Sequence, residues 1–333
     1  MKVILIYLIL LSQQIFVAIG DEPPALMGDW VGSYEPRPNS NYREYVAAEV
    51  IGASGNQFTV HLMKEFNRRT ELDFDITLPL QNGVIQHSDQ RWKFEISNDS
   101  FLGARKFGSH EEQKFELKKV LRLSPTLGRV PPEGAENLFE GPSLDKWAHR
   151  GGVAATWKVT SDGVVEILPN KKNDLFSKKS YKDCELHLEF LIPYQPNKTG
   201  PHRGNSGLYL QGSYEVQILD SYGVPGGWAD CGALYRIAPP KVNMSAPPGQ
   251  WQTYDIVFRS ARFDNTGKVV AFPTMTVRHN GVFIHHEQII DQMNTSINPT
   301  QKQLPVKEPR PLILQDHENN VKFRNFWIIP LSE

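Results

Sequence analysis

Short apolar runs, several of them alternating with polar residues and most ending at a turn residue, most constrain how this chain can fold. Residues 254–259 and 274–278 alternate with the two-residue period of a half-buried strand. Asn280-Gly281 stands between two such runs and is typical of a tight hairpin. Aromatic residues make up 11% of the 333 residues and prolines number 24. The chain is therefore predicted to be all-β.

A segment rich in proline and glycine, residues 124–136, separates two β-rich regions and shows no hydrophobic period. Before it, residues 21–123 hold short strand-like runs that predict a small antiparallel β-sheet or barrel. After it, residues 137–333 hold many short candidate strands, which predict a β-sandwich. Two structural units joined by a linker are the expected organisation.

The first region shows no constellation of catalytic residues. Its Trp30, Tyr34 and Trp92 are either core residues or a surface on which a sugar could stack. An accessory or binding role is the hypothesis for this unit.

Residues 1–20 predict a secretory signal peptide. Lys2 precedes an apolar run over residues 3–11, and residues 18–20 (Ala-Ile-Gly) fit a small-x-small cleavage site. The mature chain is expected to begin near Asp21 and to be secreted or periplasmic; an uncleaved anchor helix is the alternative. No later stretch reaches the ~18 apolar residues of a membrane span, so no membrane insertion is expected after cleavage.

The net charge and the cysteine content limit which classes of partner and cofactor are expected. The net charge of −1 gives no electrostatic case for nucleic acid or an anionic membrane as partner. Cys184 and Cys231 can form a disulfide in an oxidising compartment, and two unpaired core thiols are the alternative. No CxxC pair predicts a zinc site. His285 and His286 cannot both bind one ion from a regular strand, because neighbouring strand residues point to opposite faces.

The stretch over residues 203–220 holds polar residues where a core strand is expected. In a strand that begins at Tyr214, Glu215 and Gln217 point to one face and the apolar residues between them to the other. Asp220 has the wrong parity, so a one-residue bulge is needed to bring it to the Glu215 face. We predict that these three residues line a sugar-binding groove; a solvent-facing edge row is the alternative.

Two further stretches combine apolar and polar residues in a similar way. Over residues 311–317, Gln315 and His317 share a strand face, and an imidazole can give or take a proton near neutrality. Over residues 226–235, glycines lie near Tyr235, which suits a loop that comes close to a ligand. These stretches are candidates for the same site.

Six pieces of the second region resemble one family in their order and spacing. They are residues 137–147 (NLFEGPSLDKW), 204–210 (GNSGLYL), 214–220 (YEVQILD), 231–235 (CGALY), 248–252 (PGQWQ), and 314–317 (LQDH) with 323–328 (FRNFWI). They resemble the 3-keto-disaccharide hydrolase family over about residues 137–331. The resemblance implies a concanavalin A-like jelly-roll sandwich with its site on a concave sheet face.

The resemblance also implies chemistry that starts from a ketone. Glucanases of this fold carry Glu-x-Asp-x-x-Glu, whereas here the middle position is the amide Gln217, and classical glycosidases need two carboxylates. A ketone at C3 acidifies the C2 proton, so a base can remove it, the C1 group can depart, and water can add to the enone. We expect Glu215 and His317 to be the base and acid, in either order.

Supporting roles are expected for the remaining polar residues of these stretches. Candidates for holding the keto oxygen are Arg324 and Gln315. Candidates for binding sugar hydroxyls are Asn205, Gln217 and Tyr235.

No cofactor is certain, although a divalent cation such as calcium would suit carboxylates such as Asp220, Asp230 and Asp316. Asp220 is expected to orient a partner or to help bind that cation. The expected function is an exported enzyme that cleaves 3-keto-glycosides and takes a small carbohydrate as its partner. A non-catalytic carbohydrate-binding sandwich and a passive scaffold are the alternatives.

Overall fold

The computed structural model describes residues 22–37, 42–66, 71–107, 111–168, 173–291 and 305–332. The predicted signal peptide and its cleavage site lie outside the described residues. No helix among the described residues combines the length and the apolar character that crossing a bilayer requires. The regular elements are strands and two short 3₁₀ turns, η1 (Arg150–Gly152) and η2 (Gly200–His202), so the all-β prediction is confirmed.

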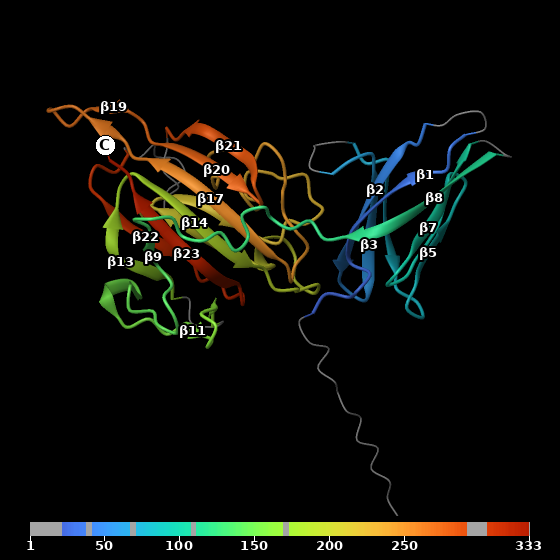
Figure 1. Ribbon diagram of the computed structural model, residues 1–333, viewed down its shortest axis with the longest axis horizontal. Helices are drawn as coiled ribbons and strands as arrows, with labels where there is room; N and C mark the ends of the chain where they lie inside the picture. Colours follow the sequence, from blue (N-terminus) through green and yellow to red (C-terminus); the bar gives the residue numbers. More distant parts are fainter. Residues whose placement is uncertain are drawn as a thin grey trace, which may run out of the picture.

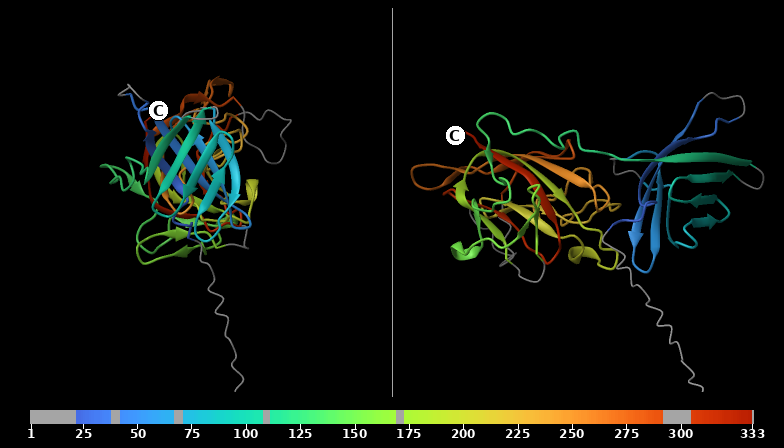
Figure 2. Two further views of the ribbon diagram at one scale, coloured as in Figure 1. Left: turned by 90° about the vertical axis from the view of Figure 1, so that its right-hand side faces the viewer. Right: turned by 60° about the horizontal axis from the view of Figure 1, so that its bottom comes forward.

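The first unit is an up-and-down antiparallel sheet that curls into a nearly closed barrel (Figure 1, Figure 2). Its strands are β1 (Gly28–Tyr34), β2 (Tyr45–Ala53), β3 (Gln57–Met63), β4 (Phe74–Pro79), β5 (Ile85–Ser88), β6 (Trp92–Ile96), β7 (Phe101–Phe107) and β8 (Glu111–Val120). Neighbours in the chain pair from β1 to β4 and from β5 to β8, and β1 also pairs with β8. Only a turn with the Gln81–Val84 bridge joins β4 to β5.

Aromatic side chains on the inner face fill this barrel. Trp30, Tyr34 and Trp92 are each at most 2% exposed and pack with Phe101 and Phe115. These three residues therefore form the core, and the hypothesis that they provide a surface for sugar stacking is wrong.

The second unit is a sandwich of two antiparallel sheets (Figure 1). The five-stranded sheet runs β10 (Trp147–Ala148), β13 (Leu175–Tyr181), β22 (Arg310–Leu314), β15 (Ser206–Leu210) and β16 (Tyr214–Ile218). The eight-stranded sheet runs β11 (Lys158–Val159), β12 (Val165–Glu166), β23 (Lys322–Pro330), β14 (Cys184–Leu191), β17 (Trp251–Arg259), β20 (Thr274–His279) and β21 (Val282–Ile289), with β9 (Glu136–Asn137) beside β23. A separate hairpin joins β18 (Arg262–Phe263) to β19 (Val269–Ala271).

Alternation along the strands decides what each face of the sandwich carries. On β16, Tyr214, Val216 and Ile218 join the core between the sheets, so Glu215 and Gln217 face outward. On β14, Leu186, Leu188 and Phe190 are in the core, so Glu185, His187 and Glu189 face outward. Both outer faces of the sandwich therefore carry polar side chains over buried apolar rows.

The two cysteines are both free and buried in the sandwich. Cys184 lies at the start of β14, whereas the Cys231 sulfur lies 3.2 Å from the Tyr254 hydroxyl. The disulfide is therefore excluded, and the alternative of two core thiols holds.

The barrel contacts the sandwich through the loop that follows β16. Tyr222 in this loop is 1% exposed and packs with the barrel core, and its hydroxyl donates to Asp29 Oδ1 at 2.8 Å. The other Asp29 oxygen accepts from Arg122 Nε at 2.6 Å. The barrel is thus attached directly to the loop that continues the Glu215 strand.

Candidate functional site

The outer face of the five-stranded sheet brings most of the predicted site residues together. Glu215 of β16 lies level with Tyr209 of β15, and Tyr209 lies level with Ile313 of β22. One row further, Gln217 pairs with Gly207, and the Gln315 amide donates to the Gly207 carbonyl from the other side. Two adjacent rows across three strands therefore present Glu215, Tyr209, Gln217 and Gln315 on one surface.

The Glu215 carboxylate lies directly above Gly207. A Cβ atom at position 207 would be 2.4 Å from Glu215 Oε1, so a larger residue there would displace the carboxylate. Tyr209 hydrogen-bonds Glu215, and Gln315 Nε2 donates to the Tyr209 hydroxyl at 3.2 Å. Burial and the nearby Glu215 charge raise the pKa of Tyr209, so its phenol stays protonated and holds the carboxylate.

Two buried amide oxygens on this side of the sheet have no partner within the described part of the chain. Gln217 Oε1 and Asn205 Oδ1 are both unpaired, although each residue is only 4% exposed. The Asn205 amide nitrogen donates to the Pro201 carbonyl at 2.6 Å, which orients the side chain. Because an unpaired buried polar atom costs free energy, these oxygens suit a ligand that brings hydroxyl donors.

The glycine-rich stretch before Tyr235 lies next to β16. The Gln217 amide donates to the Ala233 carbonyl, and the Tyr235 amide donates to the Glu215 carbonyl. Tyr235 therefore lies beside Glu215. The structure brings all three polar stretches of the sequence to one surface.

His317 lies beyond the end of β22 and is half-buried. Ile313 is level with Glu215, so four residues of chain, roughly 13 Å if extended, separate His317 from that level. That length is the upper limit of the separation along the strand, because the chain leaves the strand after Leu314.

Asp174 is a further acid near this site that the sequence did not single out. It precedes β13, and its Oδ1 accepts from the Asp316 amide at 2.9 Å. Leu175 pairs with Leu314, which puts Asp174 level with Gln315. Burial, and less strongly the charge of Asp316, raise the pKa of Asp174, which suits a proton donor. No spacing motif marks it; Tyr209 was missed for the same reason.

Asp220 does not join the Glu215 face. β16 ends at Ile218 without the predicted bulge, and Asp220 forms an ion pair with Arg203 at 2.9 Å. Burial raises the pKa of Asp220, and Arg203 opposes that rise. Asp220 therefore fixes the loop before Asn205.

The expectation of a cation gains no support. Asp230 accepts from the Gly227 amide, and Asp316 accepts from the Asn173 and Glu318 amides. Within the described ranges, no three His, Cys, Asp or Glu residues gather where they could hold a metal ion. The His285 Nε2 atom forms a hydrogen bond with the Gly232 carbonyl at 2.8 Å.

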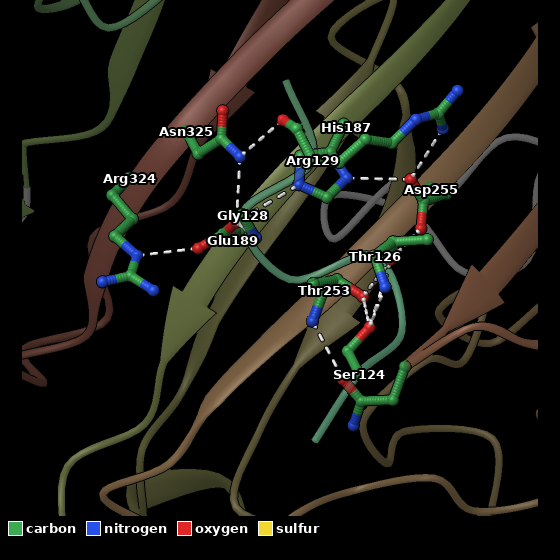
Figure 3. Close-up of polar contacts among 11 residues, drawn as sticks. Ser124, Thr126, Gly128, Arg129, His187, Glu189, Thr253, Asp255, Arg324 and Asn325 are labelled. Carbon is green, nitrogen blue, oxygen red and sulfur yellow. Dashed lines mark hydrogen bonds and ion pairs between the residues drawn. The ribbon is translucent and has the colours of Figure 1, made fainter. Parts of the chain in front are cut away.

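Arg324 lies on the opposite sheet, so it cannot hold a keto oxygen beside Glu215. Its Nε donates to Glu189 Oε2 at 2.7 Å on the outer face of the eight-stranded sheet (Figure 3). The prediction that Arg324 holds the keto oxygen is therefore wrong, whereas Gln315 lies on the Glu215 face.

The linker covers a polar network on that opposite face (Figure 3). His187 Nδ1 lies 2.8 Å from Asp255, and its Nε2 lies 3.5 Å from Glu189. Linker donors complete the network: the Gly128 amide binds Glu189 and the Thr126 hydroxyl binds Asp255. Arg129 pairs with Asp255 at 3.2 Å and lies over Trp327.

Hydrogen bonds outweigh burial in setting the charges of this network. Burial alone would raise the pKa of Glu189, but hydrogen bonds from His187, Asn325 and Arg324 lower it to about 2. Burial alone would lower the pKa of His187, but Asp255 and Glu189 raise it. His187 and Glu189 are completely buried under the linker, so this network is structural rather than an open site.

Comparison with known proteins identifies the second unit. Residues 134–329 match the family model described as the 3-keto-alpha-glucoside-1,2-lyase-like domain. The chain belongs to this family. The resemblance to 3-keto-disaccharide hydrolases is thereby confirmed, as is the concanavalin A-like sandwich. None of the curated proteins compared matches this chain.

Solved structures from Parabacteroides distasonis ATCC 8503 are similar to this chain. One, described as "a putative glycosyl hydrolase", is 35% identical with a TM-score of 0.54, covering 60% of this chain and 85% of its own. Another with the same description is 18% identical with a TM-score of 0.46, covering 61% of this chain and 99% of its own.

Proposed function

We propose that the second unit cleaves the glycosidic bond of a 3-keto-glycoside, and that the protein is exported. Glu215 is one member of its acid–base pair, and His317 is the other, in either order. The observation that carries the proposal is the Glu215 carboxylate held above Gly207 by Tyr209, beside an amide rather than a second carboxylate at Gln217. The description of the family and that of the 35% identical structure both support cleavage of a sugar bond.

The proposed reaction is an elimination followed by hydration. A base takes the C2 proton, and the electron pair of that bond moves into an enolate that ends on the C3 oxygen. The enolate then expels the C1 substituent, which an acid protonates, and leaves a C1=C2 enone. Water adds at C1 and a proton returns to C2, so the net change is the addition of one water.

The surrounding residues support binding of a sugar in this place. The unpaired oxygens of Gln217 and Asn205 are positioned to accept from hydroxyl groups, and Tyr235 lies beside Glu215. Gln315, held against Tyr209, is the remaining candidate for the keto oxygen. Each of these assignments is tested by the loss of turnover in the corresponding variant.

Asp174 supports a second candidate function, which is direct hydrolysis with inversion. In that mechanism Asp174, with its raised pKa, protonates the leaving group and Glu215 activates water. Three strand spacings, roughly 14 Å, separate the two backbones, so side chains that reach toward each other can approach the 6.5–9.5 Å of inverting enzymes. This mechanism needs no ketone.

The deciding experiment compares a p-nitrophenyl 3-keto-glucoside with the unoxidised glucoside. Elimination predicts cleavage of the keto substrate alone, with exchange of its C2 proton in deuterated water. Glu215→Gln and His317→Ala should each lower kcat by about 10²–10⁴-fold. Unchanged turnover in both variants contradicts the assignment. Cleavage of the unoxidised glucoside that depends on Asp174 establishes hydrolysis instead, and sugar binding without turnover indicates a lectin-like module.

A further inference from the structure

A groove on the outer face of the eight-stranded sheet has no role in the chemistry above. Its volume is about 310 Å³, and it lies where the linker does not cover the sheet. One cross-strand row forms most of its floor. In order across the strands, that row consists of Trp251, Leu191, Lys322, Glu166 and Lys158.

Arg324 is fixed at one wall of this groove. Its Nε donates to Glu189, whose side chain is 1% exposed and which also accepts from Gly128 and Asn325. Its guanidinium carbon lies 4.0 Å from the centre of the Trp251 ring. Figure 3 shows its two terminal nitrogens turned away from the network. A guanidinium held at one nitrogen and stacked on an aromatic ring presents its remaining donors in a rigid plane.

Hydrogen-bond acceptors stand near these donors. Asp162 lines the groove and accepts from Thr160, and its charge is close enough to Arg324 for the two to interact. Glu166 pairs with Lys158 at 3.2 Å. Three cationic and two anionic side chains line the groove, so their charges nearly cancel.

This combination fits one ligand chemistry better than others. Sugar hydroxyls both donate and accept hydrogen bonds, and sugar rings offer apolar faces to a flat surface such as the Arg324–Trp251 pair. A phosphorylated or acidic ligand would gain little net attraction from charges that nearly cancel, and Asp162 and Glu166 would oppose it locally. Pockets that bind small molecules start at about 300 Å³, so the groove is large enough for a sugar unit.

We propose that this groove is a second binding site, which takes a neutral oligosaccharide and is separate from the Glu215 face. The two sites lie on opposite outer faces of the sandwich, so one sugar ring cannot occupy both. The second site would hold a glycan chain at the protein surface while the Glu215 face acts on a different unit. This inference stands whether or not the proposed reaction is correct.

The test is binding of the full chain to an array of neutral and acidic oligosaccharides, followed by calorimetric titration with the best neutral trisaccharide. We expect Arg324→Lys, which loses the planar donors, to weaken binding by about tenfold or more. Asp162→Asn changes an exposed residue that cannot unfold the sheet, and it should also weaken binding. Arg278→Lys is the matched control, because Arg278 also stacks on an aromatic ring, Phe283, on the same sheet.

The outcomes separate this proposal from its competitors. Affinity should change little with added salt, because the ligand is neutral. Absence of binding to any neutral glycan, or binding only to acidic glycans with strong salt dependence, overturns the proposal. Unchanged binding in both Arg324→Lys and Asp162→Asn overturns it as well. If only Gln217→Ala abolishes binding, the glycan binds at the Glu215 face and not in the groove.

Discussion

The two outer faces of the sandwich both carry a buried glutamate, and their surroundings differ. On the eight-stranded sheet, both oxygens of Glu189 accept from protein donors, several of them supplied or covered by the linker. On the five-stranded sheet, Glu215 lies beside Gln217, and near two amide oxygens that have no partner among the described residues. A carboxylate enclosed by protein donors indicates a structural role, whereas a carboxylate beside unpaired buried amide oxygens indicates a place for a ligand.

The largest expected difference in stability is between Glu189→Ala and its neighbour on the same strand face, Glu185→Ala. Removing the buried Glu189 takes away the acceptor of Arg324 and Gly128 and the anion beside the buried His187, which should cost about 3–5 kcal/mol of unfolding free energy. Glu185 is a third exposed and pairs with Arg129, so its loss should cost at most about 1 kcal/mol. Urea denaturation measures both. Equal losses would refute the structural assignment of the network.

Strand periodicity in the sequence predicts which residues face outward on the two sheets, but it does not predict which of the two faces is covered. Alternation alone places Glu215 and Gln217 opposite the core, and the same alternation in CELHLEFL places Glu185, His187 and Glu189 outward. Whether such a row is open or covered depends on contacts between distant segments. Thr126 and Gly128 lie about 60 to 130 residues along the chain from their partners. The prolines and glycines of the linker therefore form no local pattern that predicts its packing against the eight-stranded sheet.

Arg324 shows the same limit on a smaller scale. It belongs to a strand that shares the core with β22, but the alternation that puts Phe323 inside turns Arg324 to the far side of the sandwich. The resemblance indicated that the strand matters; it carried no information on which sheet holds it. Tyr209 and Asp174 were missed because only the strand register brings them to Glu215 and Gln315.

A change at Gly207 should affect activity on the proposed catalytic face more than stability. In Gly207→Ala the new methyl group would meet the end of the flexible Glu215 side chain, so the sheet is kept and the carboxylate moves. A displacement of about 1 Å can cost about 10²-fold in kcat. Steady-state kinetics with the keto substrate measures this effect. The double variant with Glu215→Gln should be no slower than Glu215→Gln alone, because both changes remove one function; additive losses would contradict the placement.

The barrel should stabilise the loop that follows β16 through the hydroxyl of Tyr222. Tyr222→Phe removes the donor to Asp29 and leaves a buried carboxylate with Arg122 alone, which should cost about 2 kcal/mol in thermal or urea unfolding. Tyr34→Phe is the matched control, because it also removes a buried tyrosine hydroxyl, but one that lies in the barrel beside Arg105 rather than at the contact between the units. Equal effects of the two changes would show that the contact between the units contributes nothing specific.

The smallest effect concerns the pH dependence of the covered network. The pKa of Glu189 falls from 4.5 to about 2 on folding, so its stabilisation is present above 4.5 and is lost as pH falls toward 2. The pKa of His187 rises above 6.5, so its stabilisation is present below 6.5 and is lost as pH rises through the folded value. The network should therefore stabilise the fold most between about pH 4.5 and 6.5.

The groups that face His187 are Glu189, Asp255 and Trp327 from the sheet, with Arg129 from the linker and Glu185 and Arg324 nearby. His187→Gln keeps the volume and removes the charge, so the loss of stability between pH 6 and 9 should shrink by about 1 kcal/mol while the acid limb persists. Urea midpoints across pH measure both limbs. His187 is the member of this network that loses a proton as pH rises and then holds its partners less strongly. If His187→Gln still loses the same stability between pH 6 and 9, the alkaline loss of stability comes from another group.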